Sequence, residues 1–121
     1  MSEVKGRIRR SLSRWASGDD LEAEELRSDT ERAGCCAIAD IVDRERVDLQ
    51  GSLRTVTLRP RGGVPALEAE LYDGSGVVTV VWLGRRRIAG IEPGRVIRVT
   101  GRTGLQDATR VMYNPRYELR C

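Results

Sequence analysis

The chain has 121 residues, 32% of them charged, and a formal net charge of +3 at pH 7. This length predicts one compact domain with a short appendage. The absence of histidine excludes Ser–His and Cys–His nucleophile pairs and removes the usual general base near neutral pH, so we expect no enzyme. No apolar run approaches the roughly 20 residues of a membrane span, and we expect a cytoplasmic protein without membrane contact.

The charge is unevenly distributed along the chain. Residues 1–18 hold five basic residues and one acid, a net charge of +4. Residues 19–48 hold four basic residues and eleven acids, a net charge of −7, and residues 49–121 hold twelve basic residues and six acids, a net charge of +6. All basic residues except Lys5 are arginine, whose planar fork can bind two phosphate oxygens at once. The acidic stretch therefore conceals a basic C-terminal domain.

Residues 1–34 predict a charged helical extension. One helical stripe near its start is apolar: Val4, Ile8, Leu12 and Trp15. This stripe belongs either to a basic arm for nucleic acid or for an acidic membrane surface, or to an ordinary amphipathic helix that docks on the domain. A second helix is predicted from about 20 to 33, with Gly34 as its C-cap. Its acidic face is either solvated or lies over the basic surface and competes with a polyanion.

From residue 38 the hydrophobic period becomes two, which predicts strands. A long first strand runs from about 47 to 59, and Gly51 within it predicts a bulge or a sharp bend. After a loop at 60–65, strands at about 67–72 and 77–82 flank the sequence DGSG. We interpret DGSG as a tight hairpin, because a P-loop would need Gly-Lys-Ser/Thr entering a helix.

The second half of the domain predicts two more strands. A connection at 84–94, with one helical turn at 85–90, leads to a fourth strand that ends at Gly101. The segment TGLQDAT is predicted as a loop, and 111–119 as a fifth strand with an irregularity at Asn114-Pro115. Alternation predicts this core: Leu49, Leu53, Leu71, Val78, Val80, Trp82, Ile97 and Val99. It predicts these outward residues on strands two and three: Glu68, Glu70, Tyr72, Val77, Thr79 and Val81.

Five strands in this order, with a long bent first strand and a central hairpin, predict a mainly β fold. The expected architecture is a five-stranded OB-fold barrel over residues 35–121, behind the helical extension. Closure of the barrel removes exposed sheet edges, which helps so small a domain.

Three segments carry a family resemblance: ELYDGSGVVTVVWLG, IEPGRVIRVTGR and MYNPRYEL. They resemble the OB wedge domain of branched-DNA helicases and, more loosely, the anticodon-binding OB domains of class II aminoacyl-tRNA synthetases. The whole chain is most similar to small stand-alone OB proteins of actinobacteria, which also carry a charged N-terminal helical segment. The resemblance covers about residues 45–120 and implies an OB fold that binds nucleic acid.

The cysteines predict neither a disulfide framework nor a metal site. Cys35 and Cys36 are sequence neighbours, which rarely pair with each other, and Cys121 makes the count odd. Zinc needs about four ligands, usually with Cys-x2–4-Cys spacing, and this chain has no histidine. We therefore expect no metal and no cofactor.

OB domains bind single strands across strands two and three, between the first–second and fourth–fifth loops. Here that face has one aromatic residue beside two acids, so arginines are expected to contribute most of the binding. The predicted nucleic-acid-binding residues are Arg54, Arg59, Arg61, Tyr72, Thr79, Arg85, Arg86, Arg87, Arg98 and Arg102. The arginines would contact the phosphates of single-stranded or branched DNA, or of RNA, without reading sequence, and Tyr72 would stack on a base.

The alternative is a protein–protein interaction module with no direct role in nucleic-acid binding. In it, the outward side chains of Tyr72, Val77 and Val81 would contact a partner protein. The acids on strand two and the few aromatic residues favour this alternative.

Overall fold

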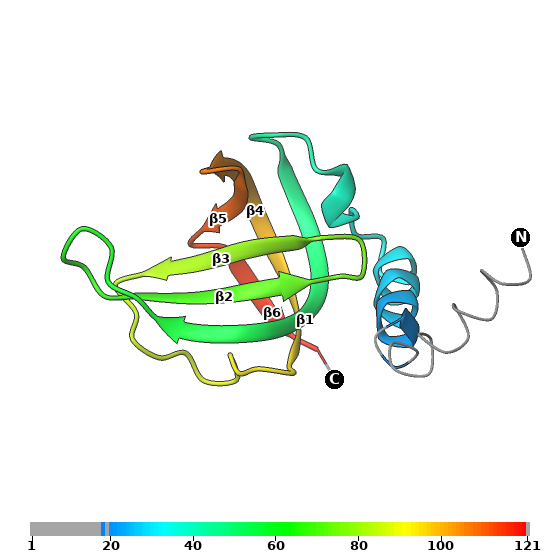
Figure 1. Ribbon diagram of the computed structural model, residues 1–121, viewed down its shortest axis with the longest axis horizontal. Helices are drawn as coiled ribbons and strands as arrows, with labels where there is room; N and C mark the ends of the chain where they lie inside the picture. The colour runs from blue at the N-terminus through cyan, green and yellow to red at the C-terminus, as the bar shows by residue number, and fades with distance from the viewer. Residues whose placement is uncertain (1–17, 19, 121) are drawn as a thin grey trace, which may run out of the picture.

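The computed structural model describes residues 18 and 20–120, and it places one helix ahead of a β-barrel (Figure 1). The helix covers 20–32, and it ends in a Schellman motif. The Cys35 and Gly34 amides donate to the carbonyls of Thr30 (3.0 Å) and Glu31 (3.1 Å), and Gly34 takes a φ of +70°. The predicted stripe near the N-terminus lies outside the described residues. Within the described part, no helix is long and apolar enough to cross a membrane.

The described chain forms one sheet from six strands: β1 (Arg46–Leu58), β2 (Ala66–Tyr72), β3 (Val77–Leu83), β4 (Val96–Gln106), β5 (Thr109–Tyr113) and β6 (Arg116–Leu119). Five of them close into a ring in the order β1–β2–β3–β5–β4, and β4 pairs back with β1. β3 and β5 are parallel, whereas the other paired strands are antiparallel. The predicted OB-fold barrel is confirmed.

β1 bends because it belongs to both halves of the barrel. Its residues 46–52 pair with β4, and its residues 52–58 pair with β2. Gly51 lies at this changeover, where a Cβ atom would sit 2.4 Å from the Tyr72 carbonyl oxygen. Glycine is therefore required for the close approach of β2. A bulge is also present, but it lies between Leu53 and Val56.

The predicted core is confirmed, since all eight residues are at most 5% exposed. Ile88 and Ile91 of the β3–β4 connection join this core. One outward prediction is wrong: Val81 is fully buried, in a second small cluster with Ala66 and Val111. This cluster is on the outer side of the sheet, because Ala66 and Val81 alternate with the inward residues Leu67 and Val80.

Three local predictions are corrected. The segment TGLQDAT is not a loop, because β4 continues to Gln106 and turns at Asp107-Ala108 into β5. Both turn residues have positive φ, +51° and +64°, as a two-residue type I′ hairpin requires. The predicted fifth strand is split into β5 and β6 at Asn114-Pro115, since proline cannot donate to the ladder. The β3–β4 connection contains turns and no helix.

The DGSG turn is held by hydrogen bonds to other groups of the protein. One oxygen of the buried Asp73 carboxylate accepts hydrogen bonds from the Ser75 amide (2.9 Å), the Ser75 hydroxyl (2.7 Å) and the Gly76 amide (3.1 Å). The other oxygen accepts from the Ile38 amide at 2.8 Å, which fixes the 3-10 helix η1 (Ile38–Asp40). The amides that a phosphate would need are thus occupied, in agreement with a hairpin and not a phosphate cradle.

The acidic helix packs beside the β2–β3 turn, at the opposite end of these strands from the β1–β2 loop (Figure 1). Leu26 is 8% exposed, and the Thr30 hydroxyl bonds to the carbonyls of Leu26 (2.9 Å) and Gln50 (3.2 Å). A Cβ atom on Gly74 would meet the Ala23 carbonyl, so the two backbones touch. The described helix therefore does not lie over the arginines of the β1–β2 loop.

Candidate nucleic-acid interface

A cavity of about 810 Å³ opens on the barrel surface where β1 begins, β4 ends and β5 passes into β6. The described residues that line it include four arginines and no acid: Arg44, Arg46, Arg102 and Arg116. We call these four residues the arginine pocket. Gln106, Tyr113 and Asn114 also line the cavity. A concave site with several positive groups and no carboxylate in its lining suits an anion.

Two of these arginines face each other across the sheet. The register pairs Arg46 on β1 with Arg102 on β4, and like charges directly opposite each other destabilise a sheet. Arg116 on β6 is opposite Thr100, the next residue of β4 on the same face. Packing of the fold does not require this repulsion, and a bound anion would relieve it.

The turn before β1 is fastened to β4. The Arg102 Nη1 donates to the Arg44 carbonyl at 3.0 Å, and the Arg44 amide donates to the Thr103 carbonyl at 2.8 Å. Arg44 takes a φ of +67°, a left-handed conformation that is uncommon outside glycine. Its side chain is 90% exposed, and Asp43 is its ion-pair partner only at 4.0 Å. Its charge therefore stays available to a ligand.

Arg98, one of the predicted binding residues, already has a partner. Its Nη2 donates to the Asp48 carboxylate at 3.3 Å, and the Thr100 hydroxyl donates to the same carboxylate at 2.5 Å. The Thr100 hydrogen bond, followed by that of Arg98, lowers the pKa of Asp48. The hydrogen bond to Asp48 in turn raises the pKa of Arg98. Arg98 is thus partly neutralised by a carboxylate that accepts a hydrogen bond from it.

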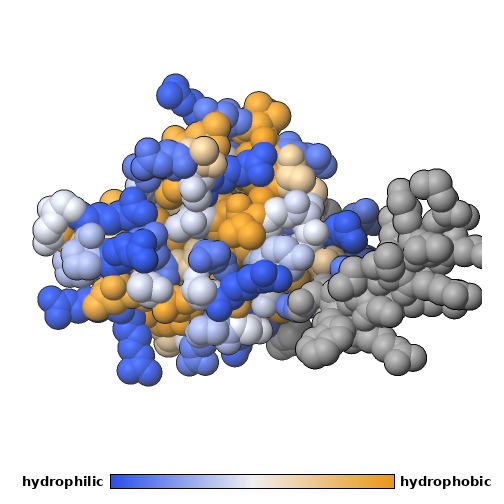
Figure 2. All heavy atoms as spheres, in the orientation of Figure 1, coloured by the Kyte–Doolittle hydropathy of each residue, from blue (hydrophilic) through white to orange (hydrophobic). Residues whose placement is uncertain are grey.

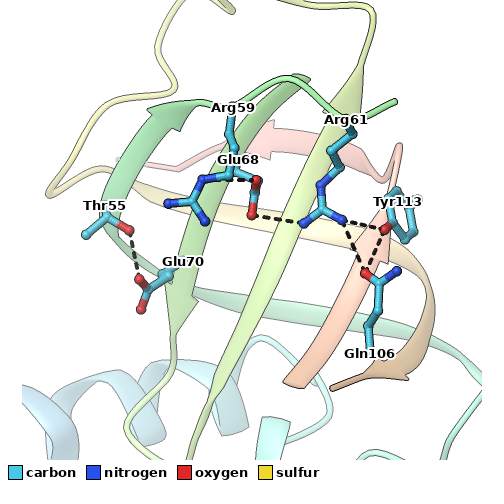
Figure 3. Close-up of polar contacts among 7 residues, drawn as sticks. All are labelled: Thr55, Arg59, Arg61, Glu68, Glu70, Gln106 and Tyr113. Atoms are coloured by element: carbon cyan, nitrogen blue, oxygen red, sulfur yellow. Dashed lines mark hydrogen bonds and ion pairs between the residues drawn. The ribbon is translucent and has the colours of Figure 1, made fainter. Parts of the chain in front are cut away.

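Arg61 spans the outer face of the sheet (Figure 3). From the β1–β2 loop, it donates to Glu68 Oε1 on β2 (3.1 Å), to Gln106 Oε1 (3.2 Å) and to the Tyr113 hydroxyl (2.8 Å). Tyr113 also donates to Gln106 at 2.8 Å. The hydrogen bond to Glu68 raises the pKa of Arg61. We call this set of contacts the Arg61 bridge, and two of its residues, Gln106 and Tyr113, also line the cavity.

Tyr72, the predicted stacking residue, has its ring covered. The guanidinium carbon of Arg54 lies 3.7 Å from the centroid of that ring, a cation–π arrangement. Thr79 lies on β3 opposite Glu70 of β2, and Glu70 accepts a hydrogen bond from Thr55 at 3.1 Å. The outer face of β2 and β3 is therefore largely paired within the protein.

The other predicted arginines gather at the loop end of the barrel. Arg59 and the run 85–87 are exposed, and the Gly84 amide donates to the Pro65 carbonyl at 2.7 Å, which brings the two loops together. In Figure 2, hydrophilic side chains are present at this end of the molecule, with apolar side chains among them. Only Arg59 among these four has an ion-pair partner in the described chain, Glu68 at 3.9 Å.

The ten predicted residues thus do not form one groove. Arg102 belongs to the arginine pocket, Arg61 borders it through Gln106 and Tyr113, and the remaining eight lie elsewhere on the barrel. Sequence reasoning missed Arg44, Arg46, Arg116 and Tyr113. Only a weak indication of two of them was present in the sequence: Arg46 directly precedes the predicted first strand, and Arg116 lies within the predicted fifth strand.

The described residues offer no metal centre. Among them, no group of three or more histidine, cysteine or acidic side chains could hold an ion. Burial raises the pKa of both Cys35 and Cys36, which disfavours the thiolate forms that bind metals.

Comparison with known proteins supports the fold. No protein-family model matches the chain, and no curated protein sequence matches it. A structure of RecG bound to a three-way DNA junction is similar over 67% of the chain, at a TM-score of 0.58 and 21% identity. A replication protein A heterotrimer bound to single-stranded DNA is similar over 70%, at a TM-score of 0.51 and 13% identity. The chain spans 12% of the RecG chain and 64% of the replication protein A chain.

Proposed function

We propose that the protein is a non-enzymatic OB-fold module that binds single-stranded or branched nucleic acid, with DNA preferred, through arginine–phosphate contacts. The arginine pocket carries this proposal, because four arginines share one cavity and two of them are directly opposed in the sheet. Each guanidinium can hold two phosphate oxygens. Neutralisation of a phosphate also releases counterions, which adds affinity without sequence readout.

A path for a strand leads from the arginine pocket toward the loop end of the barrel. Gln106 and Tyr113 line the cavity and contact Arg61, and Arg61 belongs to the same loop as Arg59. The run 85–87 follows β3 at this end of the barrel. Arg59 and the run 85–87 are exposed, and together with Arg61 they would contact successive phosphates. The similarity to RecG and replication protein A, both solved with DNA, favours nucleic acid over other polyanions.

The protein-interaction alternative has less support. Of the three side chains expected to contact a partner, Val81 is fully buried and the Tyr72 ring lies under Arg54. Val77 is left, at 39% exposed. We therefore favour nucleic-acid binding at the arginine pocket over a protein-interaction role.

The test is a titration of labelled single strand, duplex, three-way junction and RNA hairpin at several salt concentrations. Wild-type protein should bind single strand or junction more tightly than duplex, with affinity that falls as salt rises. The double variant Arg102→Ala/Arg116→Ala should bind roughly thirtyfold more weakly, at about 1 kcal/mol for each lost contact. Arg27→Ala/Arg32→Ala, which removes the same charge from the docked helix, is the matched control. Equal losses in both double variants would overturn the proposal.

A further inference from the structure

The Arg61 bridge closes the outer face of the sheet. It joins the β1–β2 loop to β2 on one side and to the β4–β5 hairpin on the other, so the Arg61 side chain crosses β3 (Figure 3). The side chain of Arg61 is 30% exposed and that of Glu68 is 12% exposed. A loop arginine and a strand carboxylate are thus held well inside the surface.

A buried apolar cluster adjoins the bridge. Ala66, Val81 and Val111 are at most 4% exposed and form a cluster separate from the barrel core. Val81 is directly opposite Glu68 on one side and Tyr113 on the other, and both are members of the bridge. Val111 also lines the cavity of the arginine pocket. The cluster is therefore continuous with the site proposed for phosphates.

The bridge leaves polar groups unsatisfied. Arg61 Nε and Glu68 Oε2 are buried and have no hydrogen-bond partner, and a buried polar atom without a partner is costly. A phosphate has more acceptor oxygens than one carboxylate and could satisfy the guanidinium more fully. Glu68 would keep Arg59 as a neighbour, at 3.9 Å. Exchange of the carboxylate for a phosphate therefore requires no change of fold.

We propose that the Arg61 bridge caps a nucleobase subsite, and that a strand held in the arginine pocket opens it when a phosphate replaces Glu68 at Arg61. The inference rests on the proposed function. Opening would uncover Ala66, Val81 and Val111 as an apolar floor, with Tyr113 beside it as an aromatic wall. This composition suits an unpaired base, since every base has a π-face that stacks without sequence preference. Glu68 is then an internal competitor that weakens binding.

The test compares two glutamines on one strand. Glu68→Gln weakens the bridge, and Glu70→Gln removes the same charge from the same face but contacts Thr55 and not Arg61. For a 15-residue oligothymidine, Glu68→Gln should tighten binding by about tenfold, whereas Glu70→Gln should change it by less than about threefold. For an abasic strand of equal length, the gain from Glu68→Gln should shrink toward that of Glu70→Gln. Equal gains from the two variants, or an undiminished gain on the abasic strand, would overturn the subsite.

A measurement without ligand separates this inference from the proposed function. The Arg61 and Val64 amides bond to each other's carbonyls at 2.9 and 3.0 Å, so their hydrogen exchange reports on the loop that carries the bridge. Exchange should be at least about tenfold faster in Glu68→Gln than in wild type and unchanged in Glu70→Gln. Unchanged exchange in Glu68→Gln would refute the cap. Faster exchange in a protein that binds no strand would instead refute the nucleic-acid function.

Discussion

Arg102→Gln should stabilise the free protein and weaken its binding to nucleic acid. The change removes one member of the opposed Arg46–Arg102 pair, and relief of a like-charged cross-strand pair contributes roughly 0.2–1 kcal/mol. The glutamine amide can still donate toward the Arg44 carbonyl, which Arg102 contacts at 3.0 Å. For a domain of this size, the midpoint of thermal unfolding should rise by roughly 1–4 °C. We expect stability to rise and affinity to fall together, because this charge would serve binding and not folding.

Calorimetry at low salt measures the stability side, because repulsion between exposed charges is screened as salt rises. Fluorescence anisotropy with a labelled single strand measures the binding side. Affinity should fall about fivefold to tenfold, and the slope of log K against log salt should become shallower by about 0.7 for one lost phosphate contact. Arg32→Gln on the docked helix makes the same charge change away from the pocket and should leave the affinity unchanged. A destabilised Arg102→Gln variant with wild-type affinity would show that Arg102 serves the fold, and our interpretation of the pocket would fail.

Three further predictions concern other parts of the barrel. Val80→Asp would bury an unpaired charge at a fully buried site and should abolish the cooperative melting transition seen by circular dichroism; a normal melting curve would contradict the core assignment. Because the pKa of Asp48 is lowered from 3.8 in the folded state, its stabilising contribution is present above pH about 4 and is lost as pH falls through the lower folded value. Urea titrations between pH 7 and 2 should therefore show a shallower acid loss for Asp48→Asn than for wild type, and parallel curves would exclude this role. Replacement of Arg85, Arg86 and Arg87 by alanine should weaken binding to every strand by a similar factor and reduce the salt slope by about 1.5–2; unchanged binding across the salt series would remove these residues from the interface.

Local alternation was sufficient to predict the strand parity of the barrel. Leu71, Val78, Val80 and Trp82 all point inward as predicted, because period two is a property of the strand itself. Val81 was predicted outward and has the outward parity, yet it is buried. It lies between Glu68 and Tyr113 in the sheet, and both of these residues accept hydrogen bonds from Arg61, twenty residues earlier in the chain. No pattern within a strand reports what a distant loop places over it.

The arginine pocket was unpredictable for a related reason. It forms because β1 pairs with β4, and the register of that pairing places Arg46 opposite Arg102, which is 56 residues further along the chain. The fourth strand was predicted to end at Gly101 and to be followed by a loop, although β4 continues through Gly101 and Gly104 to Gln106. At Gly101 the absence of a side chain leaves room for Met112, because a Cβ atom at this position would lie 3.1 Å from the Met112 sulfur. Glycine here marks a tightly wound strand, and composition alone does not distinguish that from a loop.

The double pairing of β1 also has a consequence for how the chain folds during synthesis. β1 can complete its pairing with β2 once about residue 72 has left the ribosome, but its first half must wait for β4, near residue 102. Closure of so long a loop is slow, because the entropy is lost before the contacts form. Until then, half of β1 is an unpaired edge that can add to a neighbouring chain. That edge is charged, because it begins at Arg46 and has the acids Glu45 and Asp48 beside it. These charges would keep nascent chains apart until the barrel closes.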